Sequence, residues 1–458
     1  MLQGVSSARA AGVPCRAMRA RSLSLALFAT CACSEPARRP DVVLVVVDTL
    51  RADALGIYGA EPEPAPFLAS LAADGTVFEN AFAASTWTAP ATASLLTGLY
   101  PREHGVIRGF FAQVMEQDGA APSELELARL PADVPTLAER FAAAGYRTVG
   151  LASNVNIGPE MGFERGFESF ERHDGLGARK LLERLSDLDV RLGGAEPTFL
   201  YLHLNDPHWP YQRRPRYYVE PGELPADETA AEVVRRRALY ASEIGLVDDA
   251  LREALLARGL GPSTLFVLVA DHGEEFQEHG RWFHLFSLYG ELARVPFFFH
   301  APALGVRAQR VAASTSGVDL APTLAEMCGL PPVGEESGRS LAPLLGEPWM
   351  RPGDLAAELD ARPIFAHRFE PGAGEELWSV IRGSWKLIEG PEELELYDLA
   401  ADPGERRNLA AAEPARLAEL SALLAAHRAG ATRAGGERAH VELDEALLRR
   451  LETLGYVK

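Results

Sequence analysis

Short apolar runs separated by helix-like patterns dominate the chain after residue 40. Val42 to Val47 is a continuous valine and leucine run, typical of a strand buried on both faces of a parallel sheet. Similar runs recur at Thr148–Leu151, Thr198–Leu204, Thr264–Val269 and Val295–Phe299. Helical patterns lie between them at Val134–Ala144 and Arg235–Leu256. This alternation predicts an α/β fold with a mostly parallel sheet sandwiched by helices.

The pattern changes after residue 350. Leu377–Ile388 and Glu395–Leu399 indicate a hairpin or meander, and a helical stretch from Ala415 to His427 follows. These elements predict a smaller C-terminal α+β subdomain. We therefore expect a leader over residues 1–33, a main domain over 40–350 and the C-terminal subdomain over 351–458.

The leader has the layout of a secretory signal. Three arginines within residues 16–21 precede an apolar run from Leu23 to Ala29 that is too short to span a bilayer. The following segment resembles a bacterial lipoprotein signal in which Cys31 or Cys33 is lipidated. We expect export to the periplasm or cell envelope, with a lipid anchor at one of these cysteines. A misassigned start codon followed by a disordered leader is the alternative.

Charge and cysteine content exclude one class of partner and two kinds of structural site. The chain has 64 acidic and 45 basic residues, a formal charge of −19, so its field repels nucleic acid and predicts no nucleic-acid partner. An anionic substrate would need a locally positive site, which a bound metal ion can supply. Cys328 is the only cysteine after the leader, which excludes an intramolecular disulfide framework and a cysteine-rich zinc site. The sequence indicates no oligomeric state.

Carboxylates follow two of the predicted strands directly. Asp48 ends the first run, and Asp271 and His272 follow the run that ends at Val269-Ala270. Ligands of open α/β sheets gather at the carboxyl ends of the strands, so these side chains are expected at one edge. A carboxylate there is costly to bury unless it is paired or binds a metal.

A hydroxyl begins the predicted helix between Ser85 and Gly98. Thr88 can serve as the N-cap, Pro90 fits the first turn and Gly98 ends the helix. Unpaired backbone N–H groups and the helix dipole favour an alkoxide or an anion at this position. An ordinary N-cap would explain the hydroxyl without any metal.

Seven segments together resemble the sulfatase family of the alkaline phosphatase superfamily. In chain order they are Asp48–Asp53, the Thr88 helix with Leu95–Gly98, Asp271–Phe276, Gly317–Thr323, Gly338–Leu341, Leu396–Leu399, and Asp402–Glu405 with Asn408. They cover nearly all of the chain after residue 40. The resemblance implies an alkaline-phosphatase-like fold, a sulfatase-like catalytic domain over 40–350 and an ester-hydrolase activity.

The resemblance also implies roles for single residues. Asp48, Asp271 and His272 match metal ligands, and Thr88 matches the nucleophile that also contacts the metal. His208 matches a histidine that touches the substrate or leaving group, and His284 matches one in the related phosphoethanolamine transferases. His104 and His279 are expected to be structural. For Arg51, orientation of an anionic group and an ordinary salt bridge both remain open.

The chain departs from the common sulfatase pattern in two motifs, the nucleophile motif and the metal-ligand pairs. Common sulfatases have Cys-x-Pro-x-Arg, whose cysteine becomes formylglycine, whereas this chain has Thr88-Ala89-Pro90-Ala91-Thr92. Threonine nucleophiles occur in phosphodiesterases and phosphoethanolamine transferases of the superfamily. The pair Asp271-His272 replaces the Asp-Asn of the calcium site, so we expect one divalent ion, with Zn²⁺ or Mn²⁺ favoured over Ca²⁺. A second ion at Asp206, His208 and His284 stays open.

The expected function is hydrolysis of a sulfate or phosphate (di)ester, an anionic substrate, through a covalent Thr88 intermediate. One alternative is a transferase of the phosphoethanolamine or phosphoglycerol type. Such relatives usually have several transmembrane helices, and no long apolar segment is present here, which favours the hydrolase. The other alternative is a non-catalytic binding protein on the same fold. Retention of both Asp48 with Thr88 and Asp271 with His272 argues against it.

Overall fold

The computed structural model describes residues 39–110, 124–284, 286–331, 336–351, 353–369, 376–430 and 438–442. The predicted leader, with Cys31 and Cys33, lies outside these residues, so export and lipidation stay predictions. The chain from Arg39 onward forms one compact unit. Among its described helices, none combines the length and the apolar character that crossing a membrane requires.

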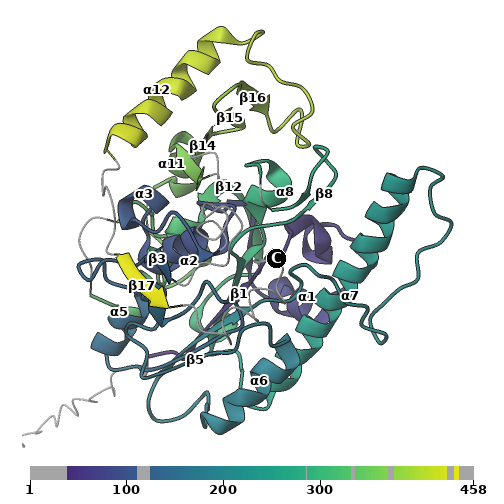
Figure 1. The fold of residues 1–458 in the computed structure, drawn as a ribbon. Helices are drawn as coiled ribbons and strands as arrows, with labels where there is room; N and C mark the ends of the chain where they lie inside the picture. Colours follow the sequence, from purple (N-terminus) through teal and green to yellow (C-terminus); the bar gives the residue numbers. More distant parts are fainter. Residues whose placement is uncertain are drawn as a thin grey trace, which may run out of the picture. The chain divides into compact units, whose positions relative to one another are not determined.

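A nine-stranded sheet forms the centre of this unit (Figure 1). Five parallel strands lie side by side in the order β7 (Leu265–Ala270), β1 (Val42–Val47), β6 (Thr198–Leu204), β4 (Arg147–Ala152) and β5 (Ser169–Arg172). The sheet continues through β11 (Phe297–His300), β2 (Thr76–Phe82), β10 (Arg294–Val295) and β12 (Gln309–Ser316). All six residues of β1 are buried, because strands cover both of its edges and side chains pack on both faces. The predicted mostly parallel α/β sheet is confirmed.

One predicted strand differs from the structure. The run Val295–Phe299 is divided between β10 and β11, and both strands pair antiparallel with their neighbours. Pro296 separates them, and proline has no N–H to donate to a ladder. An apolar run signals burial but does not encode strand direction.

Helices pack in two groups, on either side of the sheet in Figure 1. One group consists of α1 (Pro66–Ala73), α6 (Ala178–Asp187) and α7 (Glu228–Leu256). The other consists of α2 (Thr88–Thr97), α5 (Leu137–Ala143) and α9 (Leu320–Cys328). Helix α7 begins seven residues before its predicted start, because Asp227 caps it by accepting from the Ala230 N–H.

A small antiparallel sheet follows the main sheet along the chain. Its strands are β13 (Ile364–Phe369), β14 (Glu376–Arg382), β15 (Trp385–Glu389) and β16 (Leu394–Asp398), and α12 (Pro414–Gly430) packs on β14 and β15. This confirms the predicted C-terminal α+β elements. It also has its own apolar core, made of Trp378, Val380, Leu387, Leu396, Leu420 and Leu424. A further pair, β3 (Glu124–Ala128) with β17 (Arg438–Glu442), was not predicted.

Candidate active site

The carboxyl ends of neighbouring parallel strands bring the two predicted aspartates together. Asp48 follows β1 and Asp271 follows β7, and the ends of these strands, Val47 and Ala270, are register partners. The strands therefore deliver both carboxylates to the same edge of the sheet, as the sequence predicted.

Asp48, Asp271 and His272 form a buried cluster whose ligand atoms all lie within 4.8 Å of one another. His272 Nε2 lies 3.7 Å from Asp48 Oδ1 and 3.8 Å from Asp271 Oδ2. Two ligands on one tetrahedral ion lie about 3.4 Å apart when each bond is near 2.1 Å. The cluster is therefore close to the geometry of a single divalent ion.

The carboxylate oxygens of this cluster that lack a hydrogen-bond partner also fit a cation. Asp48 Oδ1 and Asp271 Oδ2 are buried without a hydrogen-bond partner among the described residues. Burial and the neighbouring Asp271 raise the pKa of Asp48 well above its usual value. Burial acts in the same direction on Asp271, but His272 and His203 outweigh it and keep its pKa below the usual value. A bound cation would compensate the charge that two adjacent carboxylates place here.

Thr88 lies beside the cluster at the start of α2. Its Oγ1 is 3.4 Å from His272 Nε2, and the residue is only 4% exposed. The predicted capping role is wrong by one position, because Trp87 is the N-cap and Thr88 is the first helical residue. The hydroxyl therefore faces His272 instead of closing the helix end.

Two residues without a predicted role complete the cluster. The Asn154 amide, which follows β4, donates to Asp48 Oδ2 at 2.6 Å and to Asn205 Oδ1 at 3.0 Å. His203 on β6 places Nε2 3.7 Å from Asp271 Oδ2. His203 lies on β6, which is next to β1, and Asn154 follows β4, the next parallel strand, so the strand-end rule that located Asp48 could also have found Asn154. His203 lies inside an apolar run, and no local signal separates it from a core histidine.

His208 and His284 lie next to the same cluster. The His284 ring centroid is 4.7 Å from that of His272 and 4.9 Å from that of His208. Burial, together with the neighbouring His284, lowers the pKa of His208 to about 4. Burial and His272 lower the pKa of His284. The structure thus brings together all six residues predicted for the site: Asp48, Thr88, His208, Asp271, His272 and His284.

The remaining polar candidates are engaged elsewhere. Asp206 accepts from the Ala178 N–H through Oδ2 and from Arg214 through Oδ1, so both of its carboxylate oxygens have protein partners, and a second ion at Asp206, His208 and His284 stays a prediction. Arg51 forms ion pairs with Asp53 and Glu278. These contacts favour the salt-bridge alternative for Arg51.

The two histidines expected to be structural make contacts of that kind. His104 Nε2 lies 3.0 Å from Ser94 Oγ. His279 lies between Glu291 and the backbone carbonyl of Glu405.

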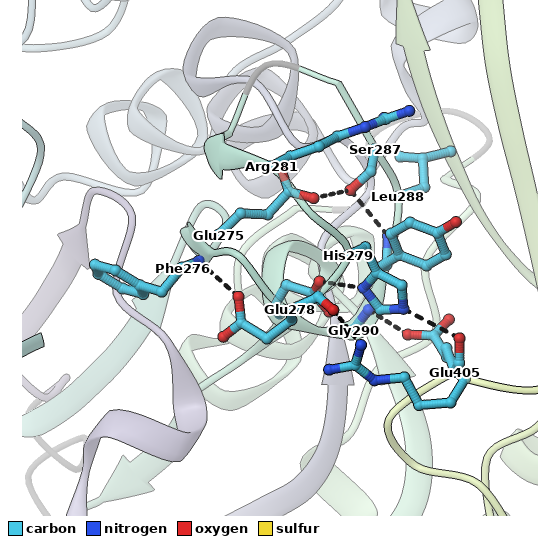
Figure 2. A network of polar contacts seen from close by, with 12 residues as sticks. Glu275, Phe276, Glu278, His279, Arg281, Ser287, Leu288, Gly290 and Glu405 are labelled. Atoms are coloured by element: carbon cyan, nitrogen blue, oxygen red, sulfur yellow. Dashed lines mark hydrogen bonds and ion pairs between the residues drawn. The ribbon is translucent and has the colours of Figure 1, made fainter. Parts of the chain in front are cut away.

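His279 and Gly290, which lie on either side of His284 in the sequence, both contact Glu405 in the C-terminal part of the chain (Figure 2). The Glu405 carboxylate accepts from the Gly290 N–H, and its backbone carbonyl lies 3.0 Å from His279 Nε2. Lys386 on β15 donates to the Leu288 carbonyl and pairs with Glu405, both at 2.6 Å. Contacts between distant parts of the chain therefore fix the loop that carries a predicted substrate histidine.

Two family models match the chain. The model described as Sulfatase matches residues 40–330. The model described as N-sulphoglucosamine sulphohydrolase, C-terminal, matches residues 277–426. The first covers more than half of the chain and includes every residue of the cluster.

Curated relatives match over most of their length. A Δ4,5-hexuronate-2-O-sulfatase of Bacteroides thetaiotaomicron is 24% identical over 87% of this chain and 89% of its own. A choline-sulfatase of Rhizobium meliloti is 25% identical over 81% of this chain and 82% of its own.

Solved structures share the fold at lower identity. The phosphonate monoester hydrolase of Agrobacterium radiobacter has a TM-score of 0.66 and 20% identity, covering 89% of this chain and 100% of its own. A protein solved in complex with its substrate D-glucosamine-2-N,6-O-disulfate has a TM-score of 0.70 and 19% identity, covering 86% of this chain and 98% of its own. At these identities the likeness extends to the fold alone.

Proposed function

The chain belongs to the sulfatase family of ester hydrolases, and we propose that it cleaves a sulfate or phosphate ester with Thr88 as its nucleophile. The observation that carries the proposal is the position of Thr88 Oγ1, 3.4 Å from His272 Nε2 beside the Asp48–Asp271 pair. A hydroxyl at a helix start next to a candidate metal cluster has the surroundings that activate an alcohol for attack.

The residues of the site suggest two steps. Thr88 Oγ attacks sulfur or phosphorus in line, forming a covalent ester as the bond to the leaving oxygen breaks. His208 and His284 lie next to the cluster, where an N–H of either neutral ring can donate a hydrogen bond that stabilises the charge on that oxygen. Water then releases the product from Thr88. The N-terminus of α2 points N–H groups at an anion bound beside Thr88.

Asp48, Asp271, His272 and Thr88 would hold one divalent ion. Such an ion lowers the pKa of a bound hydroxyl and balances negative charge on the reacting group. The imidazole and the small set of carboxylates favour Zn²⁺ or Mn²⁺ over the oxygen-rich shell that Ca²⁺ prefers.

Both ester classes have support. The curated relatives are named as sulfatases of a hexuronate and of choline, which favours a sulfate ester. Thr88 in place of the formylglycine cysteine and the Asp271-His272 pair favour phosphate-type chemistry, and a phosphonate monoester hydrolase shares the fold. A panel of aryl sulfates, phosphate monoesters, phosphodiesters and phosphonates assayed with one enzyme preparation decides between them.

Replacement of Thr88 tests the nucleophile. We expect Thr88→Ala to lower kcat at least about 10³-fold on the best substrate, because a covalent route loses its attacking atom. Quenched wild-type enzyme should contain a sulfated or phosphorylated Thr88 peptide by mass spectrometry, and the variant should not.

Thr97→Ala is the matched control, because Thr97 is a buried threonine at the other end of the same helix. It should keep activity within about threefold, as substitutions outside the site leave transition-state contacts intact. Substantial turnover by Thr88→Ala would eliminate Thr88 as the nucleophile.

A further inference from the structure

A cavity of about 480 Å³ adjoins the candidate active site at His208. Its walls come from three segments, which are residues 175–180 at the start of α6, residues 205–214 after β6 and residues 243–246 on α7. His208 lines the cavity, and its ring centroid lies 4.9 Å from that of His284. A cavity of this size can enclose a small ring-shaped ligand.

A tryptophan and three other apolar residues contribute to the wall. Trp209 is 36% exposed, and its ring packs edge-on against Phe283 with the centroids 5.1 Å apart. Leu176, Pro210 and Leu246 also line the cavity. An exposed indole that is held by a second ring offers a flat apolar surface, on which one face of a saturated ring can pack.

Two buried polar atoms of the lining residues lack partners. Glu243 is 2% exposed, and its Oε1 accepts from the Gln212 backbone N–H at 3.0 Å. Glu243 Oε2 and Arg214 Nε are both buried without a hydrogen-bond partner among the described residues. Buried polar groups are rarely left unsatisfied, so a ligand or water is expected to complete them. A hydroxyl suits both atoms, because it donates as well as accepts, and it can bond to a carboxyl group in either protonation state.

The positive charges of the lining residues in this region are compensated within the protein. Arg214 Nη2 lies 2.9 Å from Asp206 Oδ1 and 3.2 Å from Glu243 Oε1. Arg179, which also lines the cavity, pairs with Asp249 at 2.9 Å. These pairs favour a neutral hydroxyl over a second anionic group as the partner of this wall.

We propose that the cavity binds the alcohol part of the ester, and that this part is a neutral, hydroxylated saturated ring. One face of the ring packs on Trp209, and a ring hydroxyl bonds to Glu243 Oε2. The proposal rests on the proposed function, because the adjoining site must hold the ester bond. It deepens that function by naming the class of leaving group and by assigning Trp209 and Glu243 as specificity-determining residues.

The first test compares leaving groups on the metal-loaded enzyme. The probes are 4-nitrophenyl esters and the monosulfates and monophosphates of D-glucose and D-galactose. We expect KM for the best of these pyranose esters to be at least about tenfold lower than for the 4-nitrophenyl ester of the same acid, because only the pyranose supplies hydroxyls. Turnover of 4-nitrophenyl esters without turnover of any pyranose ester would overturn the proposal.

A charged ring is the alternative occupant, because the exposed Lys180 also lines the cavity. The same assay therefore includes the esters of D-glucuronic acid. A lower KM for these esters than for the neutral pyranose esters, lost in Lys180→Ala, would show that the cavity selects an anionic ring and would contradict the neutral ligand.

Replacement of Glu243 tests the hydroxyl contact. Glu243→Ala should raise KM for the best pyranose ester about tenfold and KM for the 4-nitrophenyl ester less than about threefold. Glu243→Gln should stay within about threefold of the wild type on both, because an amide still bonds to a hydroxyl. Thermal unfolding checks that each variant is folded. An equal rise in KM on both esters would remove the assigned contact.

Replacement of Trp209 tests the packing surface. We expect Trp209→Ala to raise KM for the pyranose ester about tenfold and Trp209→Phe to raise it less, because phenylalanine keeps a flat ring. Trp385→Ala is the matched control, since Trp385 is a half-buried tryptophan on β15 that packs with Arg416. An unchanged KM in Trp209→Ala would rule out packing on Trp209.

Binding separates this proposal from the nucleophile assignment. Isothermal titration calorimetry of the metal-loaded wild type and Glu243→Ala with the pyranose esters should give a Kd about tenfold weaker for the variant. Turnover by Thr88→Ala would refute the nucleophile and leave the comparison of leaving groups intact. Equal Kd values for the wild type and Glu243→Ala would refute the role of Glu243 and leave Thr88 unaffected.

Discussion

At the scale of single residues, the site is built from buried polar groups whose partners come from other strands. Asp48 is the clearest example, because Asn154 engages Oδ2 while Oδ1 faces His272. One oxygen is thus used to orient the side chain and the other is left for a cation. Metal ligands in proteins are commonly fixed by such outer hydrogen bonds.

Removal of the Asn154 amide should weaken metal binding. We expect Asn154→Ala to lower the affinity for Zn²⁺ or Mn²⁺ about 10- to 100-fold, since Asp48 loses the bond that sets its rotamer. Competition titration with a chromophoric chelator measures the change. Asn80→Ala is the control, because its amide donates to the Ala312 carbonyl at the edge of the sheet. Equal affinities for Asn154→Ala and the wild type would rule out this role.

At the scale of elements, the C-terminal sheet is connected to the main domain at the loop before α8 (Gly290–Ala293). The Lys386–Glu405 pair, on β15 and the segment after β16, is almost completely buried at 0% and 1% exposure. The same pair contacts the backbone at Leu288 and Gly290. The C-terminal sheet therefore contributes to the site indirectly, by fixing the loop.

Breaking this buried pair should be strongly destabilising. We expect Glu405→Gln to lower the free energy of unfolding by about 3 kcal/mol, because it leaves a buried ammonium without its counter-ion. The double variant Lys386→Met with Glu405→Gln should lose less than the sum of the two single variants. Urea denaturation measures all three. Additive losses would mean that the two side chains are not energetically coupled.

Glu243 on α7 is a buried acid that should make the stability of the fold depend on pH. Burial, with Asp206 as the next contribution, raises the pKa of Glu243 to about 8. Between about pH 5 and pH 8 the Glu243 carboxyl is therefore protonated in the folded state but ionised in the unfolded state. The contribution of this group to the stability of the fold falls as the pH rises through this range.

Glu243→Gln should remove this pH dependence. Relative to the variant, the wild-type Tm should drop by about 3 °C or more between pH 5 and pH 8.5, because only the wild type must bury a charge there. Differential scanning calorimetry at a series of pH values measures the difference. A constant difference in Tm across the window would contradict the raised pKa.

At the scale of the whole molecule, the candidate metal ligands join segments that are far apart in the chain. Asp48 follows β1, Thr88 begins α2, and Asp271 and His272 follow β7. An ion bound by these groups would link elements across the main domain and would separate two like charges. Its binding free energy therefore adds to the stability of the fold.

Removal of the metal should affect stability and activity together. We expect EDTA to abolish turnover and to lower Tm by a few degrees, since a ligand at 100 times its Kd contributes about 2.7 kcal/mol. Zn²⁺ or Mn²⁺ should restore both properties, and metal analysis should give one ion per chain. Restoration by Ca²⁺ alone would show that the metal assignment is wrong.

The sequence by itself determined the central sheet and the first members of the site. β1 and β6 match their predicted runs residue for residue, because a strand buried on both faces must be continuously apolar. Asp48 and Asp271 were found by the same logic, since a charge directly after such a strand lies at the edge where ligands bind. The family motifs then pointed to Thr88, His208 and His284, whose roles stay predictions.

Only the tertiary structure decided the partners of these residues. Asn154 contacts Asp48 across 106 positions, and the pairing of Glu274 with His284 depends on a loop that Lys386 and Glu405 hold. The tertiary structure alone also decided the antiparallel direction of β11 and the position of Thr88 one residue inside α2. Periodicity reports which side chains are buried, whereas these contacts depend on strand order and side-chain rotamers. Both are set by the packing of segments that are distant in the chain.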